Sequence, residues 1–549
     1  MGAPSKGRRG AMIGAALVAL AVLIPLRGLF RAEGGSMEEG FMLVFPERVL
    51  AGDVPNKDFL HLYGPGSLWV LAGAFKAFGV SIFVERGVGL LHNLSLIGSV
   101  FVFALPWGPT VATVAALLAL VIAITPIGLI ALPWVGGLGF VTVGAVIAAR
   151  ALPDGPWADR RPERLTLLGG ACFGFGLLYR PDLVLAVALA GAVLWWAADP
   201  SRRRRLVYGL LAGSSPMLIH LVMAGPANAF RGMFLQPVFD LREGRRLPVP
   251  PSGDDLDGYL QKINELDTLD WPAPFNTPQQ IRLWFFVLLA ATAFVAVVAL
   301  LGVRRARPPW RSQLLLVGAA ISVGILPQAV QRPDTTHLAW VACFTLPMLI
   351  VAIADLVERR SLESAPKKAW IASALVASLL VVVVFPFFSA RRYADLSLQT
   401  FGRSRSATAV THDGRTFYEG RADISPAFDE LAAAVDEVTE PGDRLFVGPA
   451  DLSRTPYVDS YLYHLFSDLV PATYYIEMDP GVADADDSGL EDDLATADVV
   501  VLSTLWDRWE EPNASVQDGS DASERVLAEQ FCLRGTFGEP TIFELHTPC

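Results

Sequence analysis

Residues 36–79 have the sequence SMEEGFMLVFPERVLAGDVPNKDFLHLYGPGSLWVLAGAFKAFG, and they follow the first long apolar run of the chain. The segment carries two adjacent carboxylates, Glu38 and Glu39, and further on Lys57 beside Asp58. Because an apolar run precedes it, we expect the segment to lie at a membrane surface. Acidic side chains held there are suited to chemistry on a lipid-bound substrate.

The whole chain is rich in apolar residues. Of its 549 residues, 52% are hydrophobic and 18% are charged, and the mean hydropathy is +0.42. An ordinary soluble domain is about one-quarter charged. Several runs approach the roughly 20 apolar residues that a helix needs to cross about 30 Å of hydrocarbon. The sequence therefore predicts a polytopic α-helical membrane protein that contacts membrane lipids.

Charge divides the chain into two parts. Residues 391–549 contain 31 acidic residues and 11 arginines, a net charge of −20, whereas residues 1–390 carry +9. We therefore expect a membrane domain at 1–390, a linker at 391–423 and a soluble domain at 424–549. Strand-like runs at 444–448 and 498–503 alternate with helical patterns in the last part, which predicts an α/β domain. Its acidity argues against a nucleic-acid partner, because no basic patch could neutralise phosphates.

Apolar runs predict eleven membrane spans. They are 11–30, 82–105, 109–127, 130–150, 165–180, 182–199, 206–224, 282–302, 313–329, 337–356 and 369–389. The basic clusters at 160–164, 202–205, 304–311 and 359–368 then share one side with the amino terminus, as the positive-inside rule requires. The pair Arg391-Arg392 is the exception. This topology predicts a multi-pass protein of the plasma membrane with a cytoplasmic amino terminus.

An odd number of spans places the loops 32–81 and 225–281 and the C-terminal domain outside the cytoplasm. Cys532 and Cys549 both lie in that domain, and an exterior location would allow a disulfide between them. We expect the Pro- and Asp-rich loop 225–281 either to cover a site or to be an inert linker. The C-terminal domain shows no catalytic motif, so we expect it to bind or position a substrate.

Polar residues at the ends of the spans gather on this outer face. Arg180-Pro181-Asp182 joins two spans, and the tripeptide recurs as Arg332-Pro333-Asp334. Charges in such positions are costly unless they are paired or functional. Either tripeptide could instead be helix punctuation, with proline and aspartate in the first turn of the next helix. Glu85-Arg86 could be an interfacial anchor, and the histidines within spans, His92 and His220, are expected to be hydrogen-bonded.

The segment from Glu38 to Gly79 resembles the first outer loop of the GT-C glycosyltransferases, which include protein mannosyltransferases and lipid A aminoarabinose transferases. That loop carries an acidic pair, a Leu-x-x-Gly-x-x-Pro turn, an aspartate, a proline and a Phe-Gly end. The matching residues are Gly52, Pro55, Asp58, Pro65, Phe78 and Gly79, with Val49 in place of the leucine, and Arg86 at the start of the second span. Elsewhere the similarity is architectural.

The resemblance implies that a sugar moves from a polyprenyl-phosphate donor to a glycan, lipid or protein acceptor of the cell envelope. Such a transfer needs a base for the acceptor hydroxyl and positive charge for the departing phosphate. Glu38 aligns with the leading acid of the family and is the first candidate base, with Glu39 the second. That leading acid is commonly aspartate, so the glutamate here leaves open which of the two is the base. Arg332 and Arg180 are the candidate phosphate ligands, and Lys57 is a third.

Other polar residues of the outer face could orient those groups or hold sugar hydroxyls. These candidates are Asp58, His61, Arg86, Asp182, Gln331, Asp334 and His337. The sequence requires no cofactor, and a divalent cation among the carboxylates would be compatible with it.

Two other classes of protein are alternatives. A transporter or lipid flippase for a cell-envelope precursor would place ionisable groups near the bilayer midplane and use inverted repeats. We find no convincing repeat in the sequence. A non-enzymatic anchor would leave Glu38 and Glu39 apart from Arg180 and Arg332. The relative positions of these four residues therefore discriminate among the classes.

Overall fold

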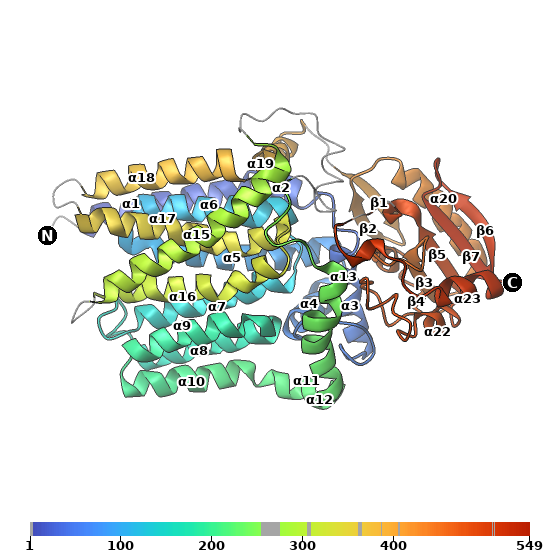
Figure 1. Cartoon of the computed structure of the whole chain (residues 1–549), viewed down its shortest axis with the longest axis horizontal. Helices are drawn as coiled ribbons and strands as arrows, with labels where there is room; N and C mark the ends of the chain where they lie inside the picture. Colours follow the sequence, from blue (N-terminus) through green and yellow to red (C-terminus); the bar gives the residue numbers. More distant parts are fainter. Residues whose placement is uncertain are drawn as a thin grey trace.

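The computed structural model describes residues 4–253, 275–304, 309–360, 365–385, 387–403, 407–507, 509 and 511–549. A helical bundle makes up one end of the molecule and a sheet-containing domain the other (Figure 1). The amino terminus lies at the end of the bundle remote from the C-terminal domain (Figure 1). The domain bounds that charge suggests stay a prediction.

The bundle has a helix at each range that the sequence predicts to span the membrane. The helices are α1 (Pro4–Leu23), α2 (Leu26–Leu29), α5 (Ile82–Ala104), α6 (Pro109–Ile127), α7 (Pro133–Arg150), α8 (Pro162–Tyr179), α9 (Val184–Ala197), α10 (Pro200–Ser214), α11 (Pro216–Ala224), α15 (Thr277–Val303), α16 (Trp310–Gln331), α17 (Thr335–Arg360) and α18 (Ala365–Leu379). Short 3-10 turns lie at Leu105–Trp107 and Pro181–Leu183, and a π-helical turn at Leu380–Val384 follows α18. Within the described ranges, seven helices are long and apolar enough to cross a membrane. The protein is a multi-pass membrane protein, and the count of eleven stays a prediction.

Close packing between α8 and α10 depends on glycine. Gly170 and Gly174 on α8 face Gly209 and Gly213 on α10, and a Cβ at any of the four would overlap the backbone of the facing helix. Small residues four apart let two helix backbones approach closely in a membrane. These glycines therefore set the distance between the two helices.

Short helices lie between the bundle and the C-terminal domain. Helix α3 (Glu38–Ala51) runs through Pro46 and ends at Gly52, whose φ of 109° suits glycine, and α4 (Gly66–Phe78) follows it. The expected second outer loop is helical over α12 (Pro226–Phe230), the π-helical η3 (Arg231–Asp240) and α13 (Leu241–Arg245). Residues 254–274, which include most of the Asp-rich part of this loop, lie outside the described residues. Figure 1 shows α3, α4 and α13 at the junction of the two parts.

The C-terminal domain is built on a five-stranded mixed sheet of order β4-β3-β5-β7-β6. Its strands are β3 (Arg444–Pro449), β4 (Val470–Pro471), β5 (Val499–Ser503), β6 (Phe531–Phe537) and β7 (Phe543–Pro548). Strand β3 is parallel to β4 and β5, whereas β7 is antiparallel to β5 and β6. All five residues of β5 are buried, as expected for a central strand covered on both faces. The predicted α/β character is confirmed.

Helices and a hairpin surround this sheet. The helices are α20 (Ile424–Val438), α21 (Tyr461–Leu465), α22 (Leu490–Leu494) and α23 (Ala522–Gln530), and two 3-10 turns lie at Thr504–Trp506 and Ala514–Val516. The range 391–423, which the sequence suggests is a linker, contains the end of α19 (Phe387–Thr400) and the hairpin β1 (Thr408–His412) and β2 (Arg415–Glu419). The turn residues Asp413 and Gly414 both have positive φ, as a two-residue hairpin turn requires.

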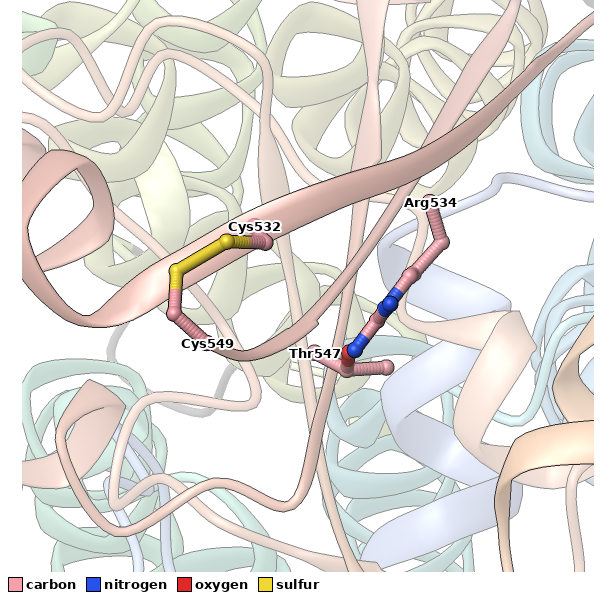
Figure 2. The surroundings of a disulfide bond; sticks show 4 residues. All are labelled: Cys532, Arg534, Thr547 and Cys549. Carbon is pink, nitrogen blue, oxygen red and sulfur yellow. A yellow bond between two sulfur atoms is a disulfide. The ribbon is translucent and has the colours of Figure 1, made fainter.

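A disulfide joins the last two strands. Cys532 in β6 and Cys549 after β7 are bonded, with their Cα atoms 5.0 Å apart, beside the hydrogen bond from Arg534 Nε to Thr547 Oγ1 (Figure 2). The pairing that the sequence allows is therefore present. Disulfides persist in oxidising compartments.

Replacing both Cys532 and Cys549 with serine should lower the free energy of unfolding of the C-terminal domain by about 3 kcal/mol. The reason is that the disulfide closes the loop from residue 532 to residue 549 and so restricts the unfolded chain. Denaturant unfolding followed by tryptophan fluorescence measures the change. Cys172→Ala, at a free cysteine in α8, is the control and should leave that transition in place. An equal transition in the double serine variant would contradict the prediction.

Candidate functional site

The candidate site lies where three loops of the C-terminal domain meet the bundle. Each loop follows the carboxyl end of a parallel strand: 450–460 follows β3, 472–489 follows β4 and 504–521 follows β5. In the loop after β4, Tyr474 O accepts a hydrogen bond from Leu60 N at 2.9 Å, which joins the loop to the first outer segment. In open α/β sheets, ligands bind outside the carboxyl ends of parallel strands. The edge of the sheet that faces the bundle is therefore the one at which open α/β sheets bind ligands.

Glu38 begins α3 and lies at this junction. Its Oε2 accepts a hydrogen bond from the hydroxyl of Tyr457, in the loop after β3. Burial raises the pKa of the Glu38 carboxyl, Arg245 opposes the rise, and the charges of Asp479 and Asp334 add to it. Glu38 is thus a half-buried carboxylate that electrostatic interactions connect with three other parts of the chain.

Glu39 has a different environment. Its carboxylate accepts two hydrogen bonds from Arg86, at 2.6 Å from Nε and 2.7 Å from Nη2. The side chains of Glu39 and Arg86 are 0% and 2% exposed. Arg86 also donates to Leu29 O at 3.4 Å and lies over the ring of Tyr418. This bidentate ion pair joins α3 to α5, and both carboxylate oxygens of Glu39 are bonded to Arg86.

Asp58, Lys57 and His61 make contacts within the first outer loop. Asp58 Oδ2 accepts from Val54 N at 2.8 Å, and Lys57, whose side chain is 52% exposed, lies 3.6 Å from Asp58 Oδ1. His61 is buried, with Nε2 at 3.3 Å from Gly64 O, and burial lowers its pKa to about 3. His61 is therefore neutral at physiological pH. The structure places these three residues in contacts within their own loop.

Arg180 lies between α8 and α9, surrounded by aromatic rings. It donates to Asp182 from Nε at 2.9 Å and from Nη2 at 2.6 Å. Its guanidinium lies 4.4 Å from the ring centroid of Tyr63, 5.0 Å from Trp134 and 5.9 Å from Trp340. Aromatic faces attract a desolvated cation at such distances. The side chain of Arg180 is therefore held in one orientation.

Arg332, after α16, uses three of its nitrogens. Nε donates to Asp334 Oδ2 at 2.6 Å, Nη1 to Arg245 O at 2.5 Å, and Nη2 to Glu511 Oε1 at 2.5 Å. His337 Nδ1 lies 2.8 Å from Asp334 Oδ1. Burial would raise the pKa of Asp334, but His337 and Arg332 outweigh burial and hold it well below its usual range. Asp334 therefore stays ionised and orients Arg332.

Gln331 and the two histidines within spans have other partners. Gln331 Nε2 donates at 3.4 Å to a backbone carbonyl of η3. His220 Nε2 lies 2.8 Å from Asn56 Oδ1, and His92 Nε2 lies 3.5 Å from the hydroxyl of Tyr179. The expectation that both histidines are hydrogen-bonded is confirmed.

Five residues at the junction were not predicted from the sequence: Arg245, Tyr457, Glu477, Asp479 and Glu511. Arg245 Nε lies 2.5 Å from Asp479 Oδ1. Within the described part of the chain, Glu477 Oε2 and Asp479 Oδ2 are buried and make no hydrogen bond. Burial, reinforced by Asp479, raises the pKa of Glu477 well above its usual value. One feature of the sequence could have indicated part of this group: the two acids Glu477 and Asp479 lie within an otherwise apolar and aromatic stretch.

The described residues contain no group of three or more His, Cys, Asp or Glu side chains that could hold a metal ion. Asp479 at the junction is paired with Arg245, and Asp334 and Glu511 are paired with Arg332. We assign no step of the reaction to a metal ion.

The fold is that of the GT-C glycosyltransferases, as the first outer loop predicts. The chain is similar to the crystal structure of ArnT from Cupriavidus metallidurans bound to undecaprenyl phosphate, with a TM-score of 0.54, 14% identity and 97% of each chain covered. Another similar structure is the oligosaccharyltransferase AglB from Archaeoglobus fulgidus in complex with an inhibitory peptide and a dolichol-phosphate (TM-score 0.49, 11% identity, 96% of this chain and 74% of that chain). No family model and no curated protein matches the chain.

Proposed function

We propose that this protein is a glycosyltransferase that moves a sugar from a polyprenyl-phosphate-linked donor to an acceptor of the cell envelope, at the outer face of the plasma membrane. The observation that carries the proposal is the half-buried carboxylate of Glu38 in a junction that also contains Arg245 and the Arg332–Asp334 pair. The similar ArnT structure is bound to undecaprenyl phosphate, which supports a donor of this class. The disulfide in the C-terminal domain supports an exterior location.

Glu38 is the proposed general base. It would take the proton of the acceptor hydroxyl as that oxygen attacks the anomeric carbon, and the lipid phosphate would leave with the electron pair of the broken bond. Burial raises the pKa of Glu38 toward the physiological range, where proton transfer is most effective. Glu39 is already occupied by Arg86, which favours Glu38 of the two candidates.

Arginine forks match phosphate geometry, so Arg332 and Arg180 are the proposed ligands of the departing phosphate. Both already bind carboxylates, Arg332 with Asp334 and Glu511 and Arg180 with Asp182. A phosphate would take the place of one of these carboxylates. Asp334, held by His337, would keep Arg332 oriented during the exchange.

The transporter alternative expects ionisable groups near the middle of the membrane. Glu38, Arg180 and Arg332 instead lie at ends of helices, and Glu38 and Arg332 both contact loops of the C-terminal domain. This placement favours an enzyme that works at one face of the bundle.

The decisive experiment incubates the purified full-length protein with a panel of polyprenyl-phosphate hexoses and pentoses and measures release of polyprenyl phosphate. We expect turnover of at least one donor, with a product on an acceptor. Failure to release polyprenyl phosphate from every donor, in the presence of envelope glycans, lipids and peptides, would contradict the proposal.

Replacing Arg332 with alanine should weaken donor binding by at least about 30-fold, equivalent to about 2 kcal/mol, because it removes the proposed charged partner of the phosphate. Titration with polyprenyl phosphate alone measures the change. Arg332→Lys, which keeps the charge but not the fork, should weaken binding less. Arg525→Ala, in an exposed ion pair of α23, is the control. An unchanged donor affinity in a folded Arg332→Ala protein would refute this role.

A further inference from the structure

Tyr457 connects the C-terminal domain to the candidate base. It is 7% exposed, and its hydroxyl donates to Glu38 Oε2 across 419 residues of sequence. Its ring centroid lies 4.2 Å from that of Trp506 and 5.3 Å from that of Trp509. Trp506 Nε1 in turn donates to Asp459 Oδ1 at 2.9 Å. The hydroxyl of Tyr457 is therefore aimed at Glu38 by a packed aromatic cluster that belongs to the C-terminal domain.

The other charged groups that face Glu38 come from three further segments. Arg245 on α13 lowers the pKa of Glu38, whereas Asp334, between α16 and α17, and Asp479, after β4, raise it. Glu477, from the same loop as Asp479, also interacts with Glu38. The carboxylates outnumber the cation, and burial works in the same direction. A hydroxyl donor at Glu38 is therefore important, because a hydrogen bond to the charged form favours that form.

We propose that Tyr457 is a positioning residue through which the C-terminal domain orients the Glu38 carboxylate and stabilises its ionised form. This inference rests on the proposed function, in which Glu38 is the base. It assigns to the C-terminal domain a part in the reaction itself, in addition to the binding of a substrate. Because Tyr457 contacts Glu38 only when the domain is docked on α3, docking and activation of the base are coupled.

The test compares the full-length wild type with Tyr457→Phe, which removes only the hydroxyl. Tyr475→Phe is the matched control, since Tyr475 lies in the same domain and donates to Ser488 O at 2.9 Å within its own loop. Two quantities are measured: the pH dependence of kcat for a polyprenyl-phosphate donor, and the titration of the Glu38 carboxyl by infrared difference spectroscopy. The band of Glu38 is assigned by its loss in Glu38→Gln.

In Tyr457→Phe we expect the pKa of Glu38 and the acidic limb of the kcat profile to move upward by about one pH unit, the size expected for a hydrogen bond to a charged group. The donor KM should stay unchanged, and Tyr475→Phe should match the wild type in every measurement. An unmoved Glu38 titration in a folded Tyr457→Phe protein would overturn the inference. The wild type could show no turnover while the titration of Glu38 still shifts as expected in Tyr457→Phe. This result would overturn the proposed function and leave the contact between Tyr457 and Glu38 established.

Discussion

Replacing Glu38 with glutamine should abolish glycosyl transfer and leave the protein folded. The amide has the shape of the carboxylate and can still accept the hydrogen bond of Tyr457, but it cannot take a proton from an acceptor hydroxyl. General base catalysis contributes about 10²–10⁴-fold to a rate. We therefore expect kcat to fall by at least about 100-fold. Initial rates of polyprenyl-phosphate release measure the loss.

The melting temperature is a second quantity to measure on the Glu38→Gln variant. Burial raises the pKa of Glu38, so its ionised form is disfavoured in the folded protein. Replacing it with a neutral amide removes that cost, and the melting temperature of Glu38→Gln should equal or exceed that of the wild type. Glu440→Gln, at an exposed acid of the C-terminal domain, is the control for activity and stability. Full activity in Glu38→Gln would remove the assignment.

The bundle could be predicted from the sequence because its signal is local. A run of about 20 apolar residues is needed to span the hydrocarbon whatever the rest of the chain does. The predicted strands 444–448 and 498–503 correspond to β3 and β5, which are apolar and buried. Strands β6 and β7 were missed, since β6 is largely exposed and a register shift between Leu533 and Gly535 interrupts its pattern. The Asp413-Gly414 turn was a local signal for the β1–β2 hairpin that the linker interpretation overlooked.

About half of the residues of the candidate site could be predicted for the same reason. Glu38, Arg180 and Arg332 lie beside recognisable span ends, and their positions follow from topology. Tyr457 and Glu511 lie in loops of the C-terminal domain, and they contact Glu38 and Arg332 only because that domain docks on the bundle. The periodicity and spacing of residues in the sequence do not predict how the domain docks on the bundle. The sequence also could not rank Glu38 and Glu39, because adjacent residues on a helix point in different directions, one here toward Tyr457 and the other toward Arg86.

Because Glu39 is paired with Arg86, we expect the loss of Glu39 to affect the stability of the protein more than the loss of Glu38. The Glu39–Arg86 pair is buried, and removing one partner of such a pair typically costs about 3–5 kcal/mol because the other charge stays uncompensated. Glu39→Gln should therefore lower the melting temperature sharply and reduce the yield of folded protein. Thermal unfolding of the purified protein in detergent measures the effect.

The double variant Glu39→Met/Arg86→Met separates a structural from a catalytic role. Apolar residues of similar volume often replace a buried ion pair without loss of stability. The double variant should thus recover most of the stability that Glu39→Gln loses, and with it the activity, because Glu38 keeps its contact with Tyr457. A stable but inactive double variant would show that Glu39 takes part in the reaction. Equal melting temperatures for Glu39→Gln and the wild type would show that the pair does not hold α3 against α5.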